Sequence, residues 1–199
     1  MGQLRIIAGK WKRRPIPVKS LTGLRPTPDR VRETLFNWLG QRCDGWRCLD
    51  LFAGSGALGL EAASRGAARV VFVESDAGAA PAIEQWIHQV GGGPECQVVR
   101  AKAQQWCGTP ASAGFDLIFI DPPFGSGMVS SIVPAAVRLL VPGGHMYVES
   151  EAPVEAAWAA SLGLSALRAD KAGAVHYHLL QFSASQGAHD ADRNLSRHL

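Results

Sequence analysis

Residues 119–125, FIDPPFG, end an apolar run with an acid, two prolines and an aromatic residue. Pro122 and Pro123 have no N–H for a sheet ladder and hold the backbone extended, so the chain leaves the sheet stiffly with its carbonyls outward. The Asp121 carboxylate and the Pro122 carbonyl can then each accept one N–H of a base's exocyclic amine. Such an amine is a poor nucleophile, and two fixed acceptors favour a tetrahedral nitrogen that can attack a methyl group. Phe124 can stack on the flipped base.

A second candidate site is the glycine-rich loop GSGALG at residues 54–59, which fits the pattern G-x-G-x-x-G. It lies between an expected strand and an expected helix, where glycine permits a sharp turn and lets a ligand approach the backbone closely. Glu74 ends the next expected strand, twenty positions after Gly54. A carboxylate there accepts hydrogen bonds from the ribose hydroxyls of an adenosine cofactor. The pattern therefore predicts a nucleoside-binding site.

Two cofactor classes share this arrangement, the nicotinamide dinucleotides and S-adenosylmethionine. The Tyr-x-x-x-Lys pair of short-chain dehydrogenases is missing, because Tyr147 is followed four positions later by Glu151, and Tyr177 by Gln181. Asp50, just before the glycine loop, suits a cationic ligand, and S-adenosylmethionine carries a sulfonium and an amino group. The residues therefore favour S-adenosylmethionine, with a nucleotide-dependent oxidoreductase as an alternative.

The elements that must position these residues alternate between strand and helix from residue 47. Strands are expected at 47–52, 69–74, 97–101, 115–121, 145–150, 164–170 and 175–182, and helices at 57–65, 77–90, 130–140 and 153–161. Near-continuous apolar strands indicate a parallel sheet covered on both faces. In a doubly wound sheet ordered 3-2-1-4-5, the first and fourth strands are neighbours, which brings Asp121 next to the glycine loop. The last two strands are too close for a helical crossover and should pair antiparallel.

The predicted fold is therefore α/β and Rossmann-like, a seven-stranded mostly parallel sheet with an antiparallel last strand. A small β-hairpin and a helix are expected to precede it. We expect three regions: a basic hairpin and helix at residues 1–45, the sheet domain at 46–182, and a disordered polar tail at 183–199.

Composition narrows the function classes. The 199 residues are 47% hydrophobic, and no apolar run approaches the ~20 residues that span a bilayer. The N-terminus lacks an apolar signal core of ~7–15 residues, so a soluble, cytoplasmic protein is expected. Four scattered cysteines are expected to be buried small hydrophobes, and no metal site is predicted. Residues 1–47 hold 11 of the 20 lysines and arginines but three acids, which favours a polyanionic partner.

Together these segments resemble the bacterial 16S rRNA guanine-N2 methyltransferases, the RsmD family. The resemblance covers most of the chain and rests on RIIAGKWKRRPIPV, RPTPDRVRETLFNWL, LDLFAGSGALGLEA, IDPPF and YVES. The second of these is the most specific, whereas the glycine loop and D-P-P-F are shared with many amino-methyltransferases. The resemblance implies a class I fold, S-adenosylmethionine as methyl donor, and N2 of one guanine in small-subunit rRNA as acceptor. It also implies an assembled or assembling small subunit as substrate.

The resemblance also assigns residues. It implies a catalytic motif of Asp121, Pro122, Pro123 and Phe124. The expected cofactor contacts are Asp50, Phe52, Ala53, Gly54, Ser55, Gly56, Glu74, Ala103 and Asp121. The expected RNA contacts are Lys10, Lys12, Arg13, Arg14, Arg25 and Arg30. The polar stripe Arg30, Glu33 and Asn37 corresponds to a helix that closes over the methionine end of the cofactor.

One position departs from the family pattern. Lys102 stands where these enzymes usually have Asp or Asn, and lysine has no acceptor for the adenine amine. The backbone amide of Ala103 is then the expected adenine contact.

The chain is expected to be a monomer. Two other functions stay open. D-P-P-F serves a DNA adenine-N6 methyltransferase equally well, although the sequence after Asp121 merely completes the sheet and offers no target-recognition domain. The second alternative is an RNA-binding protein that has the same fold but no catalytic activity.

Overall fold

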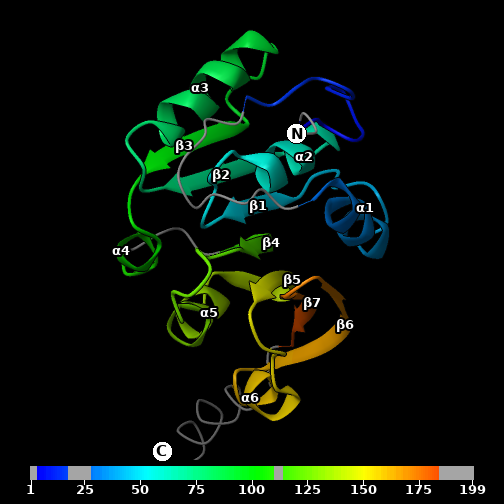
Figure 1. Ribbon diagram of the computed structural model, residues 1–199, viewed down its shortest axis with the longest axis vertical. Coiled ribbons are helices and arrows are strands. Elements are labelled where there is room, and N and C mark those ends of the chain that lie inside the picture. The colour runs from blue at the N-terminus through cyan, green and yellow to red at the C-terminus, as the bar shows by residue number, and fades with distance from the viewer. Residues whose placement is uncertain (1–3, 18–27, 110–113, 184–199) are drawn as a thin grey trace, which may run out of the picture.

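A single mixed sheet organises the protein, whose computed structural model describes residues 4–17, 28–109 and 114–183 (Figure 1). Within these residues seven strands lie in the order β3-β2-β1-β4-β5-β7-β6. The strands are β1 (Arg47–Asp50), β2 (Arg69–Glu74), β3 (Cys96–Arg100), β4 (Phe115–Ile120), β5 (Leu140–Ser150), β6 (Leu164–Ala172) and β7 (Val175–Phe182). The helices are α1 (Asp29–Trp38), α2 (Ala57–Ser64), α3 (Ala79–Gln89), α4 (Ala103–Cys107), α5 (Val129–Val137) and α6 (Ala156–Ser161).

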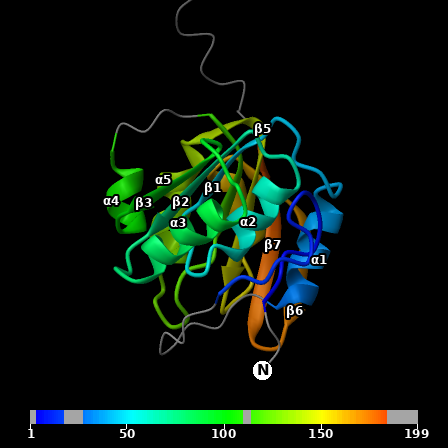
Figure 2. The same cartoon turned by 90° about the horizontal axis from the view of Figure 1, so that it is seen from above.

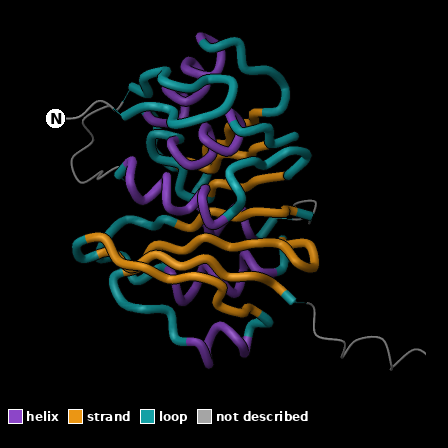
Figure 3. The backbone as a smooth tube through the Cα atoms, turned by 90° about the vertical axis from the view of Figure 1, so that its right-hand side faces the viewer, coloured by secondary structure: helices purple, strands orange, loops and turns teal. Residues whose placement is uncertain are grey.

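The pairing directions match the predicted topology. The strands from β3 to β5 are parallel, whereas β7 runs antiparallel between β5 and β6. Figure 3 shows the strands as one continuous layer. The predicted neighbours β1 and β4 are hydrogen-bonded, and the N–H of Leu51 donates to the carbonyl of Phe119 at 3.1 Å. The fold prediction is therefore confirmed.

Helices cover both faces of the sheet, because its central strands are apolar on both sides (Figure 2). Alternate strand residues such as Phe72, Phe119 and Tyr147 belong to one hydrophobic cluster with α1, α2 and α3. Their neighbours, such as Ile118 and Val148, belong to a second cluster with α4, α5 and α6. The period of two along each strand separates the two clusters.

The N-terminal arm, residues 4–17, folds back on itself as a hairpin. An isolated antiparallel bridge joins Arg5 to Pro15, and the N–H of Ile16 donates to the carbonyl of Leu4 at 2.9 Å. The arm buries Ile6 and Trp11 in the same cluster as α1 and α2. The arm and the sheet thus share one core, and the domain boundary expected near residue 45 stays a prediction.

The two largest differences from the expected elements are an additional helix and a longer strand. Helix α4 was not expected, since its five residues are too few for a helical period. Strand β5 begins at Leu140, five residues before its expected start, because the register shifts from Phe115–Leu140 to Leu117–His145. Residues 141–144, which include Pro142, Gly143 and Gly144, bulge out within the strand. Arg25 and the tail from residue 184 lie outside the described residues.

The four cysteines are buried or partly buried, as the sequence predicts. Cys43, Cys48 and Cys107 are buried, and Cys96 is partly so, all as free thiols. Burial raises the pKa of the Cys43 thiol to about 12, which makes it a poor nucleophile.

In the described part of the chain, no helix combines the length and apolarity needed to cross a membrane.

Candidate active site

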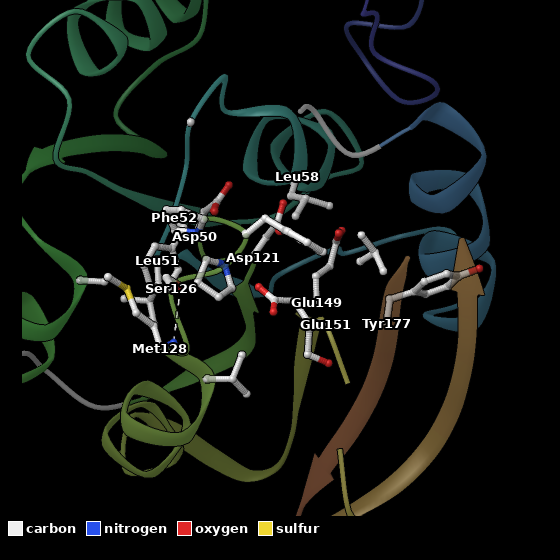
Figure 4. Close-up of a pocket in the computed structure, with 18 of the residues that line it drawn as sticks. Asp50, Leu51, Phe52, Leu58, Asp121, Ser126, Met128, Glu149, Glu151 and Tyr177 are labelled. Carbon is white, nitrogen blue, oxygen red and sulfur yellow. Dashed lines mark hydrogen bonds between the residues drawn. The ribbon is translucent and has the colours of Figure 1, made fainter. Parts of the chain in front are cut away.

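A cavity of about 1370 Å³ opens at the carboxyl ends of β1, β2, β4 and β5 (Figure 4). Strand tips at the centre of a doubly wound sheet are where such folds bind ligands. The structure brings together there eleven of the predicted site residues: Asp50, Phe52, Ala53, Gly54, Ser55, Glu74, Ala103, Asp121, Pro122, Pro123 and Phe124. Gly56 is not part of the cavity lining; it caps α2 with a left-handed φ of 79°.

The strand register explains why Asp50, Asp121 and Glu149 face the same side of the sheet. Asp50 pairs with Phe119, and Phe119 pairs with Tyr147 on the next strand. Side chains two positions apart on a strand face the same way, so Asp121 and Glu149 follow the direction of Asp50. Three neighbouring strand tips thus present carboxylates toward one cavity.

The glycine loop needs its glycines for two different reasons. Gly54 and Gly56 have φ values of 53° and 79°, in the left-handed region that side chains disfavour. Gly59 instead packs α2 against β2, because a Cβ there would lie 2.4 Å from the ring of Phe72. The third glycine therefore sets how closely the helix approaches the sheet, as the motif predicts.

Glu74 bridges the end of β2 and the glycine loop. One carboxylate oxygen accepts the N–H of Gly54 at 2.6 Å, and the other accepts the N–H of Asp76 at 2.7 Å. The acid lies in the cavity wall, as the twenty-residue spacing predicts. Its carboxylate stands where it can accept hydrogen bonds from vicinal hydroxyls.

Asp50 is 1% exposed at the base of the cavity and accepts the N–H of Gly59 at 3.0 Å. Burial raises the pKa of Asp50 to about 7, and the charge of Glu74 adds to this, while hydrogen bonds from the Gly59 and Phe52 backbone oppose it. The carboxyl group therefore titrates near neutral pH. A cation in the cavity stabilises the ionised form, so Asp50 fits a positively charged ligand.

The loop after β4 presents its aromatic ring to solvent. Phe124 lines the cavity, yet 68% of it is exposed. Leaving a large apolar ring in water forgoes about 1.5–3 kcal/mol of burial, which a stacked planar ligand would recover. The N–H of Gly125 donates to the Glu151 carboxylate, so the loop is tied to the tip of β5.

Sequence reasoning missed the contribution of β5. Glu149 and Glu151 line the cavity beside Asp121, as Figure 4 shows. A signal was present, because acids occur at or near the ends of β1, β2, β4 and β5 alike. Only the first three were assigned a role.

The basic turn of the arm, residues 10–14, lies away from the cavity. The N–H of Lys10 donates to the carbonyl of Ser64 at 2.8 Å, and the N–H of Trp11 donates to Ser64 Oγ at 2.9 Å. Ser64 ends α2, which begins at the glycine loop and is 8 residues long. At 1.5 Å per residue the helix separates its two ends by about 12 Å.

Individual basic residues differ in their surroundings. Lys12, Arg13 and Arg14 are exposed. Lys10 instead pairs with Glu95 at 2.7 Å, which ties the arm to the start of β3. An RNA contact by these residues stays a prediction.

Helix α1 borders the cavity. Pro28 and Val31 line its wall, whereas Arg30, Glu33 and Asn37 are exposed on the helix surface. This placement puts the predicted polar stripe next to the site rather than within it. Its proposed closing role stays a prediction.

The residue that departs from the family pattern lies in the cavity wall. Lys102 precedes the first residue of α4, and Ala103 is buried beside it. The lysine is exposed, and the amide of Ala103 stays the candidate for an adenine contact.

Comparison with known proteins gives one family and several close relatives. The family model described as conserved hypothetical protein 95 matches residues 4–181. The "Ribosomal RNA small subunit methyltransferase D" of Escherichia coli K12 is 41% identical over 205 residues, covering 96% of each chain. The protein of the same name from Haemophilus influenzae Rd is 40% identical over 154 residues, covering 75% of this chain and 80% of its own. The solved structure of Escherichia coli yhhF superposes with a TM-score of 0.79 at 36% identity, covering 92% of this chain and 99% of that one.

Proposed function

We propose that this chain, which belongs to the conserved hypothetical protein 95 family and to the RsmD methyltransferases, methylates the N2 amine of a guanine in 16S rRNA with S-adenosylmethionine. The relatives' names support methylation of small-subunit rRNA. The choice of guanine N2 rests on the resemblance to the RsmD family, because the D-P-P-F motif serves an adenine N6 amine equally well. We expect the protein to act as a monomer in the cytoplasm.

One observation carries the proposal: a single cavity is lined both by the residues expected to bind a nucleoside and by the residues expected to bind an amine. Gly54, Glu74 and Asp50 line it from β1 and β2, and residues 121–124 line it from the adjacent tip of β4. Donor and acceptor can therefore meet at two neighbouring strand tips. Proximity of this kind is a major source of rate enhancement.

The donor side of the cavity fits the cofactor. Glu74 would accept the ribose hydroxyls, the amide of Ala103 would contact adenine, and Asp50 would face the cationic methionine portion. S-adenosylmethionine supplies an electrophilic methyl group when bound. The neutral-range pKa of Asp50 supports this role, because a cation nearby would hold the carboxyl group in its charged form.

The acceptor side fits an aromatic amine. The Asp121 carboxylate and the Pro122 carbonyl would each accept one N–H of N2 and keep its lone pair directed at the methyl group. Phe124 would stack on the flipped base, a contact worth about 1–3 kcal/mol. Asp121 would hold the proton released by the methylated amine, which is very acidic at that stage.

A DNA adenine-N6 methyltransferase would use the same four-residue motif. However, every described element after Asp121 is a strand of the common sheet or a helix packed on it. The described elements after Asp121 therefore form no separate domain for recognising a DNA sequence. This favours a substrate that positions its own target base through its folded surface, such as a small ribosomal subunit.

The test is a mass analysis of nucleosides from small subunits incubated with the protein and methyl-labelled S-adenosylmethionine. We expect labelled N2-methylguanosine, and a parallel incubation with naked 16S rRNA compares the two substrates. Labelled N6-methyladenosine from duplex DNA would favour the adenine enzyme. No labelled nucleoside from any substrate, with RNA binding retained, would favour the silent binding protein.

A further inference from the structure

Glu149 occupies a position next to the catalytic acid that the sequence did not reveal. Val148 pairs in register with Ile120, so Glu149 and Asp121 follow them on adjacent strands. Both line the cavity, and Figure 4 shows Glu149 and Asp121 on the same wall. Glu149 is 7% exposed, so its carboxylate is held within the wall rather than in solvent.

A tyrosine from the same strand orients this carboxylate. The hydroxyl of Tyr147, two residues earlier, donates to Glu149 Oε1 at 2.8 Å. Burial and the neighbouring Glu149 charge raise the pKa of the Tyr147 hydroxyl well above its usual value, so it stays a donor. Burying a carboxylate costs free energy unless it is well hydrogen-bonded, and here one buried donor holds it in place beside the cavity.

The placement of the two acids on adjacent strand tips suits the two neighbouring donors on one edge of guanine. Guanine carries its N2 amine and its N1–H on adjacent ring positions, so both are donors on one side. An acceptor for N1–H must therefore lie beside the acceptor for N2. The tips of adjacent strands are roughly 4.8 Å apart, which supplies two carboxylates at such a separation.

Other purines lack this pattern. Adenine and 2-aminopurine carry a lone pair at N1, which a carboxylate repels. 2-Aminopurine retains the N2 amine, so it differs from guanine at N1 without losing the methyl acceptor. A site built to bind an N–H rejects an analogue without it by as much as 10⁴–10⁵-fold.

We propose that Glu149 contacts N1–H of the acceptor base and selects guanine over purines that lack this hydrogen. The inference rests on the proposed function and assigns Glu149 as a specificity-determining residue for it. Asp121 accepts from N2, and Glu149 accepts from N1. Discrimination thus comes from one attractive contact with guanine and one repulsive contact with purines that carry a lone pair at N1.

The test first maps the methylated guanine with the wild-type protein. Small subunits are then assembled from ligated 16S rRNA carrying either guanine or 2-aminopurine at that position, and kcat/KM is measured for each. We expect the wild-type protein to prefer guanine by at least about 1000-fold. Glu149→Gln should lower that ratio at least about tenfold, because its amide can donate to the N1 lone pair.

Two controls isolate the effect. Glu84→Gln removes an exposed acid on α3 and should leave the ratio unchanged. The affinity of Glu149→Gln for S-adenosylmethionine, measured by calorimetry, shows that the variant is folded. A folded Glu149→Gln protein with the wild-type ratio would overturn the proposal. Equal use of guanine and 2-aminopurine by the wild-type protein would overturn it too, without any variant. A wild-type protein that makes no N2-methylguanosine would contradict the proposed function instead.

Discussion

The guanidinium of Arg32 and the carboxylate of Glu61 form an ion pair at 3.5 Å in which neither side chain reaches solvent. Glu61 also accepts the backbone N–H groups of Ile7 and Ala8, at 2.8 and 3.0 Å, and Nε of Arg65 at 2.7 Å. One carboxylate on the helix after the glycine loop therefore joins that helix to α1 and to the N-terminal arm. The arrangement makes Glu61 the common anchor of three segments.

Glu61→Gln is expected to destabilise the protein. The change leaves the buried Arg65 without its anion and leaves Arg32 paired with Asp29 alone, at 2.7 Å. Removing one partner of a buried ion pair typically costs about 3–5 kcal/mol. Thermal unfolding should show a Tm lower by on the order of 10 °C for a chain of this size. Glu84→Gln, an exposed change on α3, is the matched control and should shift the free energy of unfolding by no more than about 0.5 kcal/mol. Equal Tm values for the two variants would refute the anchoring role.

Asp121→Ala should strongly reduce methyl transfer while leaving cofactor binding mostly intact. The variant would remove the acceptor that we propose for the reacting amine, and losses at such positions are about 10²–10³-fold in kcat. Single-turnover methylation of small subunits measures the loss, and calorimetry with S-adenosylmethionine measures binding. Turnover close to that of the wild-type protein would rule out the catalytic assignment.

Cofactor binding should depend on pH through Asp50. Since the pKa of Asp50 is raised to about 7, much of the free protein carries a neutral carboxyl group at pH 6. A cationic ligand prefers the ionised form, so binding of S-adenosylmethionine should tighten by up to about tenfold between pH 6 and pH 8. Asp50→Asn should bind more weakly and lose this dependence. A wild-type affinity that is flat across this range would contradict the assignment.

The same group should also affect stability, with a defined sign. The folded pKa of Asp50 lies above its ordinary value of 3.8, so its stabilising contribution is complete below that value and is lost as the pH rises to about 7. Asp50→Asn keeps an acceptor for the Gly59 N–H but carries no charge. Its Tm relative to the wild-type protein should therefore be higher at pH 8 than at pH 4.

Phe124→Ala should weaken substrate use without affecting the fold. The ring is 68% exposed, so its removal should change the free energy of unfolding by about 0.5 kcal/mol or less. Loss of base stacking, worth about 1–3 kcal/mol, should lower kcat/KM by roughly 5–150-fold. Phe124→Tyr retains the ring and should stay near the wild-type value. An alanine variant with unchanged kcat/KM would remove the stacking role.

The exposed turn of the arm should contribute to RNA affinity through charge alone. Changing Lys12, Arg13 and Arg14 together to Gln should weaken binding to 16S rRNA and reduce the slope of log K against log salt by about two to three. Arg168→Gln, an exposed change on β6, serves as the control. An unchanged slope would show that the turn, which lies one helix length from the cavity, is a solvated surface.

The local order of residues along the chain was enough to predict the sheet and the part of the cavity wall at the tips of β1, β2 and β4. The glycine loop between a strand and a helix, the acid that ends β2, and the D-P-P-F run after β4 are all defined by neighbouring residues. Parallel strands place their carboxyl ends at one edge, so these local patterns converge once the strand order is known. The predicted neighbours β1 and β4 follow from the same rule.

Tertiary structure decided what depends on contacts between distant segments. Glu149 stands beside Asp121 only through the register of β4 and β5, and the near-neutral pKa of Asp50 arises from burial. Glu61 joins residues up to 54 positions away, and the basic turn lies at the far end of α2. Sequence periodicity shows which face of an element is apolar, but long-range register and packing determine which charges meet on it.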